Sequence, residues 1–122
     1  MSVSIPIRPR TQTVHSGPNA GSLLAVSKAA FFKTVMAKNN SGQTLFLQMF
    51  DSATVPADGA APIGGLEVMV PPSNTGSFDY TGEADREEDG LFFQNGIVAC
   101  FSSTEGSLTL AANGGKFTIT YI

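Results

Sequence analysis

The sequence predicts an all-β fold, an antiparallel β-sandwich of jelly-roll-like type with an extended N-terminal arm. From Leu23 onward, short β-prone runs alternate with clusters of Gly, Pro, Asn, Asp and Ser, at the intervals typical of sandwiches and barrels. No segment carries an apolar face of helical periodicity. The 122 residues suffice for one domain, and 42% hydrophobic residues suffice for a core. We therefore expect an arm over residues 1–22 and one sandwich domain over residues 23–122.

The first 22 residues contain three prolines and no regular periodicity. Pro6 and Pro9 favour extended backbone in the residues before them and remove two backbone donors. Alternating apolar side chains in such a segment would allow it to lie along a neighbouring subunit or to extend that subunit's sheet. An unordered terminus is the alternative. The partner-binding residues that we predict in this arm are Val3, Ile5, Ile7, Arg8 and Arg10.

Eight strands are predicted after the arm. In residues 116–121 polar and apolar side chains alternate strictly, which indicates a strand with one buried face. Residues 44–50 are apolar on both faces, which indicates a central strand or one that faces a subunit contact. The predicted strands are residues 24–26, 30–38, 44–51, 66–70, 77–80, 91–101, 106–110 and 115–121.

Turns and one long loop separate these strands. Asn39-Asn40-Ser41-Gly42 and Asn113-Gly114-Gly115 predict tight turns, because Asn and Gly tolerate the positive φ of hairpin turns. Residues 52–65 form a long loop of small residues, and long loops in compact domains are often functional.

Charge is divided unevenly along the chain. Residues 1–50 contain five basic and no acidic residues, a net charge of +5, whereas residues 51–122 contain two basic and ten acidic residues, a net charge of −8. Such a division is more useful for docking copies together than for catalysis. The acidic pI, near 4.9, argues against nucleic acid as a partner. No apolar run approaches the roughly 20 residues that span a bilayer, so we expect no membrane partner.

The strongest local charge feature is the acidic stretch of residues 83–89. It lacks the spacing of ligands in an EF-hand loop. A solvated loop, an electrostatic docking patch and a metal site are three open interpretations, and we predict a docking patch without a metal. Its residues are Glu83, Asp85, Glu87, Glu88 and Asp89.

No catalytic signature is present in the sequence. A serine or cysteine nucleophile needs an imidazole base, and His15 in the predicted arm is the only imidazole. Cys100 lies within an apolar run that predicts a buried, unreactive thiol. We therefore predict a non-enzymatic protein with no cofactor, and an enzyme dependent on His15 is the remaining alternative.

Several blocks of sequence in the range 30–122 resemble small β-sandwich virion proteins of tailed bacteriophages and prophages, of the capsid decoration or cement type. The blocks are Phe50-Asp51 with Val55-Pro56-Ala57-Asp58-Gly59, Asn95-Gly96-Ile97-Val98-Ala99-Cys100 with Ser102-Ser103-Thr104, and Tyr121-Ile122. The resemblance implies a structural component of the particle, located on the capsid surface and synthesised in the host cytoplasm. The implied partners are the major capsid protein and further copies of this chain, with a trimer as the expected homo-oligomer.

A binding module is the second hypothesis. In it, the domain is a head-fibre or tail-associated adhesin, displayed on the virion, that binds glycans of the host surface through the loops at residues 51–65 and 81–90.

Overall fold

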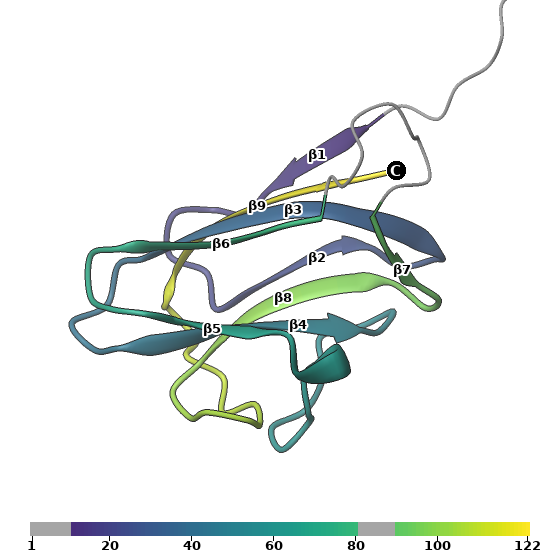
Figure 1. The fold of residues 1–122 in the computed structure, drawn as a ribbon. Helices are drawn as coiled ribbons and strands as arrows, with labels where there is room; N and C mark the ends of the chain where they lie inside the picture. The colour runs from purple at the N-terminus through teal and green to yellow at the C-terminus, as the bar shows by residue number, and fades with distance from the viewer. Residues whose placement is uncertain (1–10, 81–89) are drawn as a thin grey trace, which may run out of the picture.

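The computed structural model describes residues 11–80 and 90–122. Its strands form two antiparallel sheets that pack face to face, which confirms the predicted all-β sandwich (Figure 1). The two apolar sheet faces bury each other, as expected for layered β domains. We call the upper layer of Figure 1 sheet A and the lower layer sheet B.

Each sheet is built from strands that are distant in the sequence. Sheet A has the order β1 (Gln12–His15), β9 (Gly115–Tyr121), β3 (Ala30–Asn39) and β6 (Thr75–Asp79), and β7 (Leu91–Phe93) also pairs with β3. Sheet B has the order β2 (Ser22–Val26), β8 (Ile97–Ser102), β4 (Leu45–Asp51) and β5 (Glu67–Val70). The short 3-10 helix η1 (Ile63–Gly65) precedes β5.

The strand β6 and the strand β7 lie along the same edge of β3. β6 pairs with residues 34–38 of β3, and β7 pairs with residues 30–32. When β6 and β7 are counted as one interrupted strand, the two sheets have the orders 1-8-3-6 and 2-7-4-5. This is the topology of a jelly roll, which confirms the jelly-roll-like fold.

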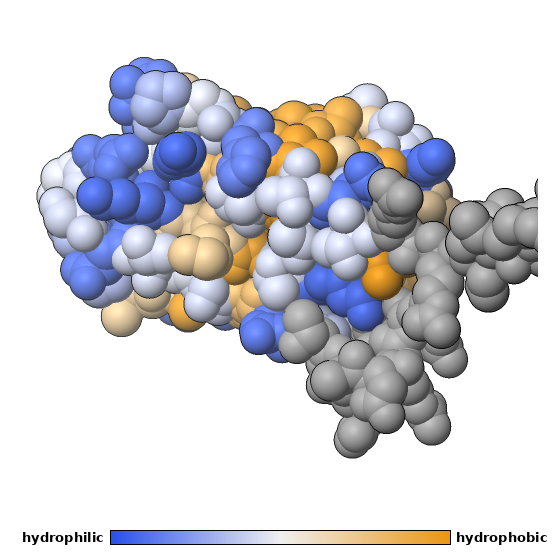
Figure 2. All heavy atoms as spheres, turned by 90° about the horizontal axis from the view of Figure 1, so that it is seen from above, coloured by the Kyte–Doolittle hydropathy of each residue, from blue (hydrophilic) through white to orange (hydrophobic). Residues whose placement is uncertain are grey.

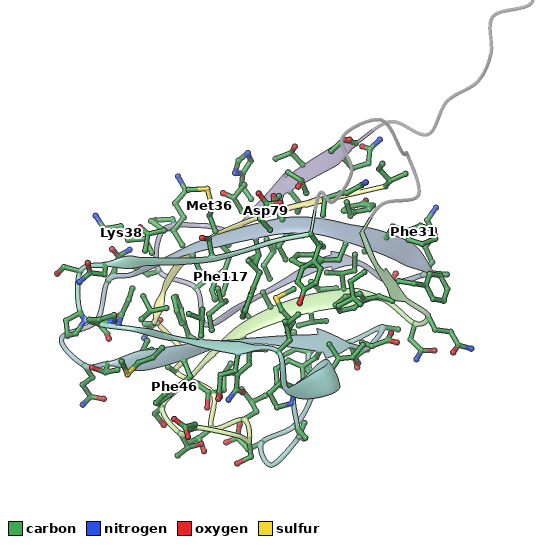
Figure 3. All side chains as sticks on the ribbon, in the orientation of Figure 1. Phe31, Met36, Lys38, Phe46, Asp79 and Phe117 are labelled. Atoms are coloured by element: carbon green, nitrogen blue, oxygen red, sulfur yellow. The ribbon has the colours of Figure 1, made fainter. Side chains whose placement is uncertain are left out.

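The core lies between the two sheets. The alternation predicted for residues 116–121 places Phe117, Ile119 and Tyr121 on the inner face of sheet A. The rings of Phe117 in sheet A and Phe101 in sheet B meet at a centroid distance of 4.9 Å, and Figure 3 shows Phe117 between the layers. The fully buried large side chains that fill this core are Phe32, Phe93, Phe101, Phe117, Leu45, Leu47, Met49, Ile97, Ile119 and Val35.

The structure corrects the predicted extent of the arm. Gln12–His15 were expected in an arm that seeks a partner, but they form β1 and pair with residues 118–121 of β9 in the same chain. The reason is that β3 pairs with only one edge of β9. The other edge is open to a further strand, and segment 12–15, which contains Thr and Val, suits that position. The remaining arm residues, Val3, Ile5, Ile7, Arg8 and Arg10, lie outside the described residues.

Two strand predictions also need correction. The run predicted at 91–101 is divided by a turn, because both oxygens of Asp51 accept backbone hydrogen bonds from Gln94 and Asn95, at 3.0 and 2.7 Å. The chain thereby passes from sheet A to sheet B. The strand predicted at 106–110 is a loop that retains one isolated bridge, Ser102 to Leu110. There the Ser102 hydroxyl accepts a hydrogen bond from the Thr109 N–H and donates to the carbonyls of Thr104 and Ser107. These bonds use backbone groups that would otherwise pair with a neighbouring strand.

The outer face of sheet B is covered by the chain's own loops. The loop of residues 52–62 and the loop of residues 103–114 lie below sheet B in Figure 1. They hydrogen-bond to each other where Gly59 N donates to Leu108 O and Leu108 N donates to Ala60 O, at 2.7 and 2.8 Å. Beneath them is a second small core of Phe50, Val98, Cys100 and Leu108. Sheet B is therefore apolar on both faces, which explains the doubly apolar run at residues 44–50.

Gln48 anchors the second of these loops. Its amide Nε2 lies 3.1 Å from Thr104 O and 3.3 Å from Ser107 O, and it donates to Glu67 Oε1 at 2.5 Å. Glu67 Oε1 also accepts the backbone N–H of Gly106 at 2.9 Å. A buried polar side chain with these partners fixes the loop over the sheet.

The buried thiol of Cys100 makes the free energy of unfolding depend on pH in the alkaline range. Burial, and next the charge of Asp58, raise the pKa of Cys100 from 9.0 to about 12. The folded state therefore holds the thiol proton more tightly than the unfolded state, so this contribution to stability is complete below pH 9.0 and is lost between pH 9.0 and about 12.

We expect the urea midpoint of the wild-type protein to decrease between about pH 8 and about pH 10.5 by more than that of Cys100→Ala. The difference between the two slopes isolates the thiol from the other titrating groups. Equal slopes in the two proteins would contradict the assignment.

Candidate interaction surface

Within residues 11–80 and 90–122, no loop covers the outer face of sheet A as two loops cover that of sheet B. In Figure 1 no described loop lies above it, and Figure 2 views this face directly, with apolar surface between hydrophilic side chains. We call it the open face. Register and alternation assign to it Thr13, His15, Phe31, Thr34, Met36, Lys38, Thr75, Ser77, Asp79, Phe92, Lys116, Thr118 and Thr120.

Apolar side chains on the open face are unusually exposed for strand residues. Met36, near the middle of β3, is 56% exposed and Phe92 is 50% exposed. The ring of Phe92 packs against that of Phe31 with centroids 5.3 Å apart. Figure 3 shows Met36 above sheet A and Phe31 at one end of it. Exposed aromatic and Met side chains on a sheet face are suited to contact with another protein.

Two lysines occupy the other end of the open face. Lys38 of β3 is directly opposite Lys116 of β9, and both are exposed. Like charges in direct cross-strand register are destabilising. The two lysines, with Met36, Thr75 and Thr118, line a shallow hollow of about 200 Å³. No carboxylate lines this hollow among the described residues.

The histidine of the sequence lies beside this cationic end. His15 Nδ1 is 2.9 Å from Thr118 Oγ1, and Thr118 lines the hollow. His15 is thus on the edge of sheet A, whereas Cys100 is in sheet B beneath the covering loops. The two groups are not placed to act as base and nucleophile.

Three of the carboxylates in the described part have structural partners of their own. Asp51 accepts the backbone N–H groups of the 94–95 turn, Asp58 accepts that of Leu110 at 3.0 Å, and Glu67 accepts that of Gly106. These carboxylates fix loops, so they are not available to neutralise the lysines of the open face. Among the described residues, no group of three or more His, Cys, Asp or Glu side chains could hold a metal ion.

A second hollow, of about 340 Å³, lies at the end of β4 between that strand and the covering loop. Its lining is mostly apolar: Phe50, Asp51, Ser52, Pro56, Ala60, Ala61 and Ile63. This is one of the two loops that the adhesin hypothesis uses, and the other, at residues 81–90, lies outside the described residues except for Gly90. Phe50 is its only aromatic residue and is buried, so the hollow has no exposed ring on which a sugar could stack.

The site residues predicted from the sequence are not placed by this structure. The arm residues Val3, Ile5, Ile7, Arg8 and Arg10 and the acidic residues Glu83, Asp85, Glu87, Glu88 and Asp89 all lie outside the described ranges. The open face itself was not predicted as a site. The sequence did contain an indication of this face, because the alternation in residues 116–121 places Lys116, Thr118 and Thr120 together on the outward side of the strand.

No family model, curated protein or solved structure matches this chain. In the ranges 11–80 and 90–122, there is no helix of the length and apolar character that crossing a membrane requires.

Proposed function

We propose that this chain is a non-enzymatic structural protein of a phage virion, of the capsid decoration or cement type, and that it docks through the open face of sheet A. The observation that carries the proposal is the contrast between the two sheets. Two loops cover the outer face of the central strands β4 and β8 of sheet B, so that only the edge strands β2 and β5 expose an apolar side chain there, Leu24 and Met69. In sheet A, by contrast, Met36 is exposed on the central strand β3 and Phe92 beside it on β7. A partner protein would cover that face in the same way.

Composition supports burial of part of this surface in an assembly. Only 14% of the residues are charged, against roughly 25% in typical soluble domains. Of the thirteen residues assigned to the open face, six are Thr or Ser and three are Phe or Met. Exposed Phe and Met side chains are the part of this composition that protein interfaces share.

The topology is compatible with the proposal but does not carry it. Jelly rolls occur in viral capsid proteins and in lectins, so the fold alone is an analogy. The partner that we propose is the major capsid protein. On the capsid surface, copies of this chain would also associate with one another, as a trimer in the proposed form. Residues 1–10 would add contacts beside β1, since the described chain begins at that edge of sheet A.

The adhesin remains the second candidate because of the 340 Å³ hollow beside the covering loop. Its apolar lining would fit a small apolar group of a ligand better than a sugar ring. Binding of host envelope polysaccharide by the isolated protein would favour this candidate over the capsid protein.

Two exposed methionines provide a matched test of the proposed docking. Met36→Glu should weaken binding to particles that lack this protein by about 30-fold, because a charge would be buried at the centre of the contact. Met69→Glu is the control, since Met69 is 60% exposed but lies on β5 of sheet B. Occupancy on purified particles, measured by sedimentation and gel quantification, gives both affinities.

Equal occupancy of Met36→Glu and wild type would remove the open face from the docking mechanism. The role of the arm requires a separate deletion of residues 2–10. A longer deletion that reaches residue 16 would also remove β1 and uncover the edge of β9, so it would confuse docking with stability.

A further inference from the structure

We infer that the Lys38–Lys116 hollow on the open face binds the acidic segment 83–89 of a second copy of this chain. This inference rests on the proposed function and deepens it, because it names the residues through which copies would associate. The hollow is lined by two lysines and two threonines together with Met36 and Ala37, and the lysine ammonium and threonine hydroxyl groups are donors that suit carboxylates. The occupant is therefore sought among segments rich in Asp and Glu.

The arrangement of the two lysines is the first argument. Lys38 and Lys116 face each other across adjacent strands although like charges in this register repel. The sheet positions beside them are Thr75 and Thr118, which are neutral. An anion in the hollow would remove the repulsion, so the pair is better suited to an assembled state than to an isolated molecule.

The distribution of carboxylates is the second argument. Of the ten acidic residues, five are concentrated in the seven positions 83–89, with one Arg. Asp51, Asp58 and Glu67 hold loops in place on sheet B or at the turn after β7. The segment 83–89 is thus the most concentrated negative charge that the chain offers to the two lysines.

Chain length favours a second copy over the same molecule. The residues on either side of the acidic segment are attached to the same place on β3. Tyr80, before the segment, donates its backbone N–H to Lys33 O, and Leu91, after it, pairs with Phe32. Lys38 is five residues farther along β3, about 17 Å at roughly 3.4 Å per residue. Tyr80 and Leu91 are eleven residue steps apart, and a segment of that length that leaves and returns to one place extends at most about 18–20 Å. The midpoint alone could come near Lys38, whereas a neighbouring copy could present the whole cluster.

Reversal of charge on each side tests the pairing. Lys38→Glu with Lys116→Glu should weaken self-association at least ten-fold, and so should Glu87→Lys with Glu88→Lys. A chain that carries all four substitutions should recover self-association to within about three-fold of the wild type, because attraction between the sites is restored with the signs exchanged. Sedimentation velocity over a concentration series measures each association, and thermal unfolding confirms that each variant is folded.

Lys28→Glu is the control, because Lys28 is exposed in the turn between β2 and β3 and does not line the hollow. It should leave self-association unchanged. Added salt, from about 0.05 to about 0.5 M, should weaken the wild-type association as exposed charges are screened.

The inference fails if the wild type stays monomeric, if salt has no effect, or if the four-fold variant associates no better than the two double variants. Because Met36 lines the hollow, a carboxylate at position 36 would also repel the segment 83–89, so the docking test that is independent of this inference is Phe92→Glu, at the other end of the open face, measured on particles. A protein whose binding to particles is weakened by Phe92→Glu and shows no dependence on the lysines would retain the proposed function and lose this inference.

Discussion

Replacing Phe117 by Ala is expected to lower the free energy of unfolding by about 3–5 kcal/mol. Phe117 is fully buried and its ring lies 4.9 Å from that of Phe101 across the two sheets. The substitution removes apolar contacts from both layers and leaves a cavity that the paired strands β9 and β3 cannot close without loss of register. Urea denaturation followed by tyrosine fluorescence or circular dichroism measures the change.

Phe92→Ala is the matched control for this prediction. The same atoms are removed, but Phe92 is 50% exposed and loses chiefly its contact with Phe31. Its cost should be about 1 kcal/mol. If the two substitutions destabilise the protein equally, Phe117 is not at the centre of the core.

Gly115→Ala is expected to destabilise the protein by about 3 kcal/mol or more, at or above the upper end of the usual cost of overpacking. A Cβ at this position would collide with the backbone oxygen of Lys38. The backbone cannot move aside, since Gly115 N donates to Ala20 O at 2.8 Å and Gly115 O accepts from Ala20 N at 2.6 Å. Gly115 therefore permits the close approach of β9, β3 and the chain before β2.

Gly42→Ala shows what the same substitution costs without a collision. Nothing lies within 4 Å of a Cβ at Gly42. We expect a change within about 0.5 kcal/mol, as for most surface substitutions. Thermal or urea unfolding of the two variants side by side gives the comparison, and a tolerated Gly115→Ala would mean that the strands at this end are less closely tied than the hydrogen bonds indicate.

The fold class could be predicted from the sequence because its strongest signals are local. The alternation in residues 116–121 and the turn signal at Asn39–Gly42 both depend on neighbours in the sequence. The first corresponds to β9. The second marks the connection of β3 with β4, but the predicted hairpin is wrong, because this connection passes from sheet A to sheet B and none of its residues has positive φ. The covering of both faces of residues 44–50 was also predicted, although the sequence did not show that the chain's own loops provide one cover.

The remaining features depend on contacts between distant residues. Segment 12–15 has no strong strand pattern of its own, and it becomes a strand because β9 offers it an edge. Residues 106–110 have strand-like alternation, but the hydroxyl of Ser102 takes their backbone groups. The hollow of the open face was not predicted because Lys38 and Lys116 are 78 positions apart and meet through strand register alone.

The pairing of β1 with β9 also determines how this chain must fold. The side chains of His15 and Thr118 form a hydrogen bond although they are 103 positions apart in the sequence. A large loop therefore has to close before sheet A can gain this contact. Domains dominated by such non-local pairing fold in roughly milliseconds to seconds, far more slowly than helical bundles. During that delay the edge of β9 is available to other chains, so nascent copies at high local concentration are exposed to mispairing before sheet A is complete.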